Sequence, residues 1–210
     1  EKAASRNWEL AVTAYAYAPL AMEGVKTIAW EIGEAIGAAD AVFVPVGGGG
    51  LFVGIHRGFR EALADGGGRL PRMVACQSAG CSNLVRGYEL GLGRPAPGPS
   101  TSRISGIQVP SPPDAVPAFA ALRESGGFGL AIDDERTWYW QEQLACKEGI
   151  FCEPAGAIAL AGAVHALQEG RIAPSDTVVC IVSGAGFKDL DRQRAMAAAH
   201  SDIPLLQVDE

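Results

Sequence analysis

Four consecutive glycines stand directly behind an apolar run, and no other feature constrains the fold of this chain as strongly. Residues 41–46 read Ala-Val-Phe-Val-Pro-Val, and residues 47–50 are all glycine. From Leu51 to Leu63 large apolar residues recur every four positions, which is the spacing of an amphipathic helix. A buried strand that passes through a glycine turn into a helix is typical of a βαβ unit in an α/β protein.

The same alternation of short apolar runs and helical stretches continues along the chain. It predicts strands at 10–14, 41–46, 73–76, 128–132 and 177–182, and helices at 22–37, 51–65, 114–124, 133–147 and 155–168. Since strands and helices alternate, we expect a three-layer α/β/α domain, with a mostly parallel sheet and helices on both faces. Residues 91–113, rich in Gly, Pro and Ser, are compatible with a linker, but we favour a loop within one domain.

Composition and charge exclude several classes of protein. The chain has 210 residues, of which 48% are apolar, so it can bury a core and is not disordered. It contains no run of about 18 apolar residues and no basic leader, so we expect neither a membrane span nor a signal peptide. A formal net charge of −7 argues against a nucleic-acid surface. The five cysteines form no C-x-x-C pair and the three histidines are scattered, which favours buried thiols in a reducing cytoplasm and no metal site.

Two glycine-bearing turns stand at predicted strand ends, at residues 47–50 and 183–186. Ligands of parallel sheets bind at the carboxyl ends of strands, and N–H groups at a helix N-terminus favour an anion such as phosphate. The plain alternative is a tight turn without a ligand, although a single glycine would be enough for that. Leu51 and Phe52 replace the Lys-Ser/Thr of a P-loop, and the G-x-G-x-x-G dinucleotide pattern fails as well. The loop therefore suits a small phosphate monoester better than a nucleotide.

Several segments resemble motifs of one enzyme family, in the family's order along the chain. Residues 44–51 resemble the phosphate-binding loop of pyridoxal-phosphate enzymes of the tryptophan synthase β type, the fold type II superfamily. Residues 153–157, Glu-Pro-Ala-Gly-Ala, resemble the family's helix start, and residues 182–189 resemble its late strand-end motif. Residues 22–32 and 121–127 are similar to segments of threonine synthases. The resemblance implies pyridoxal 5'-phosphate as the cofactor and the large domain of the fold type II architecture.

The resemblance also implies roles for individual residues. The backbone N–H groups that would bind the cofactor phosphate belong to Gly47, Gly48, Gly49, Gly50 and Leu51. Ser183 would hydrogen-bond the pyridine nitrogen through its hydroxyl, and a neutral partner of this kind suits elimination and replacement reactions. The alternative for Ser183 is a plain turn residue. Glu153 would lie near the ring, or stabilise the start of its helix as acidic residues there generally do.

One departure from the family pattern concerns the lysine that forms a Schiff base with the cofactor. The lysines of this chain are Lys2, Lys26, Lys147 and Lys188. None of them matches the family's lysine, which lies far upstream of the glycine loop. We therefore expect residues 1–14 to be the end of the small domain and residues 15–210 the C-terminal part of the large domain, with the N-terminal half of the enzyme absent. Such a fragment would hold no catalytic residue and would be inactive alone; truncation and a natural degenerate copy both stay open as its origin.

Within the family, threonine synthase is the first choice of activity, converting O-phosphohomoserine and water into threonine and phosphate. Gly48 and Leu51 argue against it, since many threonine synthases carry Asn there, and a serine or threonine dehydratase is the alternative. Arg103 is a candidate contact for an anionic substrate, or a solvated surface residue. Outside this class, a non-catalytic remnant that binds the cofactor or phosphate, and an unrelated phosphate-binding protein, stay open. The resemblance further implies a small amino-acid substrate and a homodimer in the cytoplasm.

Overall fold

The computed structural model describes residues 2–8, 12–64 and 67–199. The strands are β1 (Ala41–Pro45), β2 (Arg72–Ser78), β3 (Phe128–Ile132) and β4 (Val178–Cys180). The α-helices are α1 (Lys2–Ser5), α2 (Pro19–Glu23), α3 (Thr27–Ile36), α4 (Gly50–Ala64), α5 (Asn83–Glu89), α6 (Ala115–Glu124), α7 (Asp134–Glu148), α8 (Pro154–Gln168) and α9 (Leu190–Ala199). Short 3-10 helices are η1 (Gly24–Lys26), η2 (Ala79–Cys81), η3 (Ser105–Ile107) and η4 (Gly186–Lys188).

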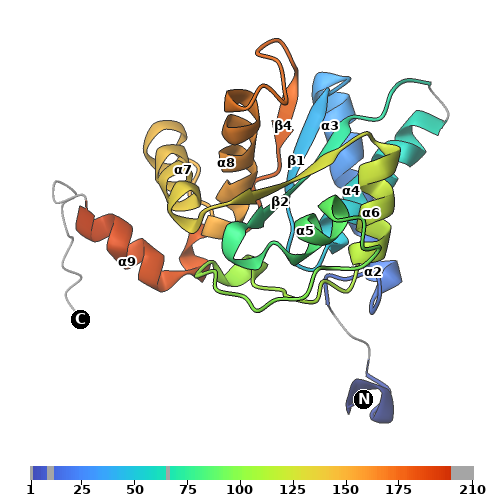
Figure 1. Ribbon diagram of the computed structural model, residues 1–210, viewed down its shortest axis with the longest axis horizontal. Coiled ribbons are helices and arrows are strands. Elements are labelled where there is room, and N and C mark those ends of the chain that lie inside the picture. Colours follow the sequence, from blue (N-terminus) through green and yellow to red (C-terminus); the bar gives the residue numbers. More distant parts are fainter. Residues whose placement is uncertain (1, 9–11, 65–66, 200–210) are drawn as a thin grey trace.

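The strands of the described residues form one parallel sheet in the order β3-β2-β1-β4 (Figure 1). β1, the strand that precedes the glycines, lies between β2 and β4, so that Phe43 pairs with Val74 on one side and Cys180 on the other. Because all strands run in the same direction, their carboxyl ends meet at one edge of the sheet. The predicted α/β class with a parallel sheet is confirmed.

Alternate residues of the sheet enter two separate cores, one on each face. Val42 and Val44 of β1 pack with side chains of α4 and α6, whereas Phe43 packs with side chains of α8. The strand is buried along its whole length, as expected for a central parallel strand that is covered on both faces. Figure 1 shows α7 and α8 on one side of the sheet and α3, α4 and α6 on the other. The three-layer α/β/α arrangement is therefore confirmed.

Two expectations near the N-terminal end are wrong. Residues 12–14 form no strand, and residues 10 and 11 of that prediction lie outside the described residues. Both neighbours of β1 are already strands, and the segment instead lies against the glycine loop, where the Thr13 carbonyl oxygen packs on Gly50. The single helix expected over 22–37 is divided into α2, η1 and α3, although Gly37 ends it as predicted.

The glycine- and proline-rich stretch at 91–113 packs as a loop against α5, a short helix that the sequence pattern did not indicate. The Asn83 amide on α5 donates to the carbonyl oxygens of Ala96 and Gly98, both at 2.9 Å. The Thr101 N–H donates to the Gly80 carbonyl oxygen at 2.8 Å. These bonds fix the stretch to the domain and exclude a free linker. Within the described part of the chain, no helix has the length and apolar character needed to cross a membrane.

Candidate functional site

A cleft of about 360 Å³ opens at the carboxyl ends of β1 and β4. Its lining includes every site residue predicted from the sequence, namely Gly47, Gly48, Gly49, Gly50, Leu51, Glu153 and Ser183. It also includes residues that the sequence did not point to, among them Thr13, Met22, Gly106, Ile107 and Lys188. A volume near the lower end of the usual range for ligand sites suits a small cofactor or metabolite. The topology thus brings two motifs more than a hundred residues apart into one site.

The glycine loop that lines this cleft has no room for side chains at its two ends. A Cβ at Gly50 would lie 2.5 Å from the Thr13 carbonyl oxygen, and a Cβ at Gly47 would lie 3.1 Å from the Gly106 carbonyl oxygen. Gly49 has a φ of 97°, which residues with side chains rarely adopt. Helix α4 begins at Gly50, so the N–H groups of its first turn have no partner within the helix and attract an anion. The loop therefore fits a phosphate group that is bound by backbone alone.

Asp114, which the sequence did not single out, fixes the glycine loop from behind. Its side chain is buried, and its carboxylate accepts hydrogen bonds from the N–H groups of Tyr15 at 2.8 Å and Ala16 at 2.9 Å. Its own N–H donates to the Gly48 carbonyl oxygen at 3.0 Å. Asp114 stands at the N-cap of α6, yet its carboxylate makes no capping bond. It ties the segment before α2 to the loop instead.

The other end of the cleft is built from the turn after β4 and the start of α8. The Glu153 N–H donates to the Gly184 carbonyl oxygen at 3.1 Å, which places the helix start against the residue that follows Ser183. Gly184 has a φ of 70°, and a Cβ there would lie 2.0 Å from Glu153 Oε1. A Cβ at Gly156 would lie 2.0 Å from the Ser183 carbonyl oxygen. Both glycines are therefore required for this close approach.

Glu153 does not use its side chain to cap α8, which was one of its two expected roles. It occupies the N-cap position without a side-chain capping bond. Its carboxylate forms an ion pair with the ammonium of Lys188, with Nζ to Oε2 at 3.0 Å. Glu153 is largely buried in the cleft, at 12% side-chain exposure, whereas Lys188 reaches it from η4 and is 59% exposed. Lys188 thus lines the cleft although its sequence position matched no expected role.

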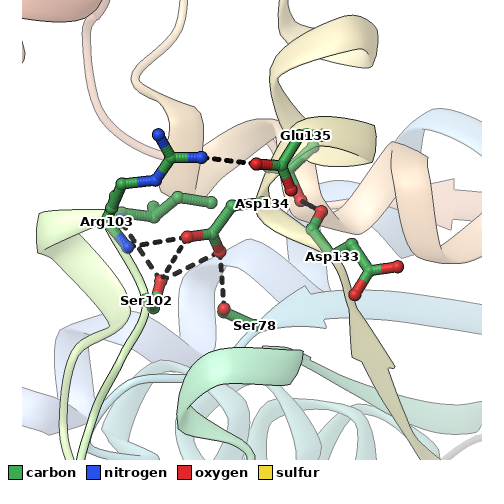
Figure 2. A network of polar contacts seen from close by, with 8 residues as sticks. Ser78, Ser102, Arg103, Asp133, Asp134 and Glu135 are labelled. Atoms are coloured by element: carbon green, nitrogen blue, oxygen red, sulfur yellow. Dashed lines mark hydrogen bonds and ion pairs between the residues drawn. The ribbon is translucent and has the colours of Figure 1, made fainter.

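A network around Asp134 holds the loop that forms the wall of the cleft near Gly106 (Figure 2). The Asp134 carboxylate accepts from the Ser78 hydroxyl at 2.6 Å and from the Ser102 hydroxyl at 3.0 Å. It also accepts from the Arg103 N–H at 2.6 Å. Asp134 opens α7, so the carboxyl end of β2, the loop and the helix are joined at one carboxylate.

Arg103, the candidate contact for an anionic substrate, does not line the glycine cleft. Its guanidinium pairs with Glu135 and lies over the ring of Trp138, 4.4 Å from the ring centroid. It lines a second cleft of about 790 Å³ beside α9, which Lys188 also borders. The contacts with Glu135 and Trp138 explain the position of Arg103. They give no support to a substrate contact in the glycine cleft.

Several thiols near the sheet are held in the protonated form by burial. Burial raises the pKa of Cys76 and Cys152, and it raises the pKa of Cys180 to about 12. A thiol is a nucleophile or metal ligand only when it is deprotonated, so none of these three is poised for such chemistry. Among the residues that the structure describes, no group of three or more His, Cys, Asp or Glu is placed to hold a metal ion.

Fold and cleft together describe an α/β domain with a glycine loop that fits a phosphate group at the carboxyl edge of a parallel sheet. A family model described as "Pyridoxal-phosphate dependent enzyme" matches residues 1–184. The chain therefore belongs to the family of pyridoxal-phosphate-dependent enzymes, and the predicted resemblance to fold type II is confirmed.

Relatives of established name agree with this assignment. A threonine synthase of Mycobacterium leprae is 37% identical over 189 residues, which cover 89% of this chain and 51% of that protein. A threonine synthase of Methanocaldococcus jannaschii is 37% identical over 177 residues, covering 82% of this chain and 44% of that protein. The chain thus spans about half the length of the curated relatives that it matches.

Solved structures share the fold at lower sequence identity. The processed form of threonine deaminase isoform 2 from Solanum lycopersicum superposes with a TM-score of 0.68 at 21% identity, covering 86% of this chain and 50% of that one. Maize serine racemase superposes with a TM-score of 0.69 at 20% identity, covering 87% and 55%. At such identities the likeness establishes the fold, and the chemistry has to be argued from the cleft.

Proposed function

We propose that the protein to which this chain belongs is a pyridoxal-phosphate-dependent lyase of amino-acid metabolism, with a threonine synthase-like reaction. One observation carries the proposal: the glycine loop and the Ser183 hydroxyl, far apart in sequence, line one cleft at the carboxyl edge of the sheet. The reaction would convert O-phosphohomoserine and water into threonine and phosphate. The 37% identity to threonine synthases over most of the chain supports this choice within the family.

The residues of the cleft fit pyridoxal 5'-phosphate at both of its polar ends. The N–H groups of residues 47–51 would bind the phosphate, and Ser183 would donate its hydroxyl proton to the ring nitrogen. When bound, the cofactor withdraws electrons from the substrate and thereby stabilises negative charge on the reacting carbon. The loop at Gly106 and Ile107 would close one side of the cleft and keep water from the ring. A neutral hydroxyl at the ring nitrogen favours elimination and replacement reactions.

Residues 48 and 51 support a second candidate reaction. Both line the cleft, and neither Gly48 nor Leu51 has an amide side chain that could bind a substrate phosphate. A substrate with a hydroxyl leaving group does not need such a contact, so a serine or threonine dehydratase that releases water and ammonia is the alternative. Assays of phosphate release from O-phosphohomoserine and of ammonia release from threonine, run side by side on the full-length protein, distinguish the two reactions.

The domain boundaries and the setting of the protein are part of the same proposal. Residues 1–14 would close a small domain, and residues 15–210 would belong to the large cofactor-binding domain. Among the lysines whose side chains the structure describes, Lys188 lines the glycine cleft, and the residue that carries the cofactor would come from the other half of the enzyme. We propose a homodimer in the cytoplasm that acts on a small amino-acid substrate, on the pattern that the family resemblance implies.

Titration of pyridoxal 5'-phosphate into the full-length protein, followed by the absorbance of the cofactor, tests the proposed phosphate site at residues 47–51. Gly48→Ala adds a methyl group to the glycine loop. The nearest neighbour of that methyl group would be Pro113 at 3.5 Å, so we expect the fold to tolerate the substitution. We expect a loss of affinity of about tenfold or more at an unchanged melting temperature. Gly33→Ala on α3, where a Cβ meets nothing within 4 Å, is the control and should bind like wild type. Absence of saturable binding by the wild-type chain would overturn the proposal.

A further inference from the structure

The ion pair of Glu153 and Lys188 lies next to the residue proposed to hold the ring nitrogen. Glu153 Oε1 lies so close to Gly184 that a Cβ there would be 2.0 Å away, and Gly184 directly follows Ser183. The Lys188 ammonium closes the pair from η4, with Nζ 3.0 Å from Glu153 Oε2. Within the described residues, these two are the acidic and basic side chains that line the cleft. One negative and one positive charge therefore face the ring end of the site.

The other titratable groups near this end are engaged or neutral. Asp114 lies behind the glycine loop, and both of its carboxylate oxygens accept backbone hydrogen bonds. The Cys152 thiol beside Glu153 is kept protonated because burial raises its pKa. On α9, Arg192 pairs with Glu142 on α7 and also donates to the Trp138 carbonyl oxygen. Asp189 accepts from the Arg192 N–H. In the neighbouring cleft that Lys188 also lines, Arg103 pairs with Glu135 and Arg194 pairs with Asp191. Within the lining of the glycine cleft, Glu153 and Lys188 therefore supply the local charge.

A carboxylate beside a pyridine nitrogen stabilises the protonated form of that nitrogen. The Ser183 hydroxyl can donate a hydrogen bond only to an unprotonated nitrogen, so protonation would force it to act as an acceptor. An uncompensated Glu153 would thus work against Ser183. The Lys188 ammonium cancels most of this effect, because it places a positive charge in contact with the carboxylate.

We propose that Lys188 is a positioning residue that neutralises Glu153 and so keeps the ring nitrogen of the bound cofactor unprotonated. The inference rests on the proposed function, since it needs a pyridine ring at Ser183. Glu153 then has a role other than helix capping: without Lys188, the Glu153 carboxylate would favour protonation of the ring nitrogen. The inference also accounts for a lysine in the cleft that belongs to no Schiff-base position.

The test uses the full-length protein and 4'-deoxypyridoxine 5'-phosphate, an analogue that retains the ring nitrogen and the phosphate but has no aldehyde. Its ultraviolet absorbance reports ring protonation, so a pH titration of the bound analogue gives the midpoint for the ring nitrogen. For Lys188→Met we expect this midpoint to rise by about one pH unit or more relative to wild type, as one uncompensated neighbouring charge produces. Lys188→Arg should restore the wild-type midpoint. Lys188→Met combined with Glu153→Gln should restore it as well, because the uncompensated carboxylate is then gone.

Lys26→Met is the matched control. It removes one ammonium that also pairs with glutamates, Glu23 and Glu61, but lies outside the cleft. Its midpoint should equal that of wild type, which excludes an effect of net charge alone. Equal midpoints for wild type and Lys188→Met, or a raised midpoint that persists in the double variant, would overturn the inference. Neither result would affect the proposed phosphate site at residues 47–51. Failure of the wild-type chain to bind the analogue at all would overturn the proposed function and this inference together.

Discussion

The glycine loop after β1 and the Ser183 turn after β4 both end parallel strands and line the same cleft, yet they are held in different ways. The loop is enclosed by backbone and buried side chains from three distant segments, at Thr13, Gly106 and Asp114. The turn rests on the start of α8, through Gly156 and the Glu153 carboxylate, and on Phe151 and Gln193, which both bond to Gly186. The phosphate end of the site is therefore fixed by segments far apart in the sequence, whereas the ring end is fixed by α8, the residues just before it and the helix that follows the turn.

The largest effect should come from the contact that supports the turn. In Gly156→Ala the new Cβ would lie 2.0 Å from the Ser183 carbonyl oxygen, and backbone cannot move aside as a side chain can. We expect a loss of about 3 kcal/mol in the free energy of unfolding, measured by denaturant titration. Gly33→Ala, also within an α-helix but with open space around the Cβ, should gain about 0.5–1 kcal/mol. A loss below about 1 kcal/mol for Gly156→Ala would show that the turn has other supports.

A single substitution that affects the glycine loop should reduce the free energy of unfolding by a smaller amount. Asp114→Ala leaves the N–H groups of Tyr15 and Ala16 without their acceptor in a buried place, which costs about 2 kcal/mol in the free energy of unfolding. Asp114→Asn retains one acceptor oxygen and should lose about half as much. Equal losses for the two variants would mean that the charge of Asp114, and not its hydrogen bonds, fixes the loop. The measurement is again denaturant unfolding.

Acid should weaken the helix that carries the loop. His56 on α4 is buried, and burial lowers its pKa below the ordinary value, with only partial compensation from Glu124 at 3.6 Å. The unfolded chain therefore takes up a proton at His56 at a higher pH than the folded chain does. The contribution of neutral His56 to the free energy of unfolding is complete above a pH of about 6.5 and is lost as the pH falls. We expect His56→Gln to flatten the pH dependence of unfolding between pH 7 and 5. An equally steep dependence in the variant would assign it to carboxylates.

The smallest effect on stability should come from the ion pair at the turn. Lys188 is 59% exposed, and pairs of this kind contribute about 0–1 kcal/mol. Lys188→Met should therefore unfold within about 1 kcal/mol of wild type, and 1 M NaCl should remove most of the difference. A larger loss would show that the pair supports the turn mechanically as well as electrostatically. The two ends of the site would then differ less in how firmly they are held.

The sequence predicts most of the fold because its signals are local. The apolar runs at 41–46 and 128–132 are bounded by turn residues and become β1 and β3 with their ends displaced by one residue or none. The glycine loop was recognisable because four glycines in a row have few uses other than close approach. The strand predicted at 10–14 does not form over its described residues 12–14, because that segment packs against the glycine loop instead.

The parts of the site that the sequence did not reveal depend on contacts between distant residues. Asp114 bonds to N–H groups 98 and 99 positions away, and nothing around it in the sequence announces those partners. Lys188 meets Glu153 only because the turn after β4 returns to the start of α8. Local patterns identify which residues can carry chemistry, whereas strand order decides which of them meet.

The position of β4 after the other three strands in the sequence also determines when the site can exist during synthesis. β1 needs β4 as a neighbour, and the Thr177 N–H bonds to Asp40 across 137 positions of sequence. After the glycine loop, a ribosome has to complete five α-helices, α4 to α8, and the strands β2, β3 and β4 before the Ser183 turn emerges. Until then one edge of β1 is exposed and can pair with other chains. Cofactor binding should therefore begin only after the Ser183 turn has left the ribosome.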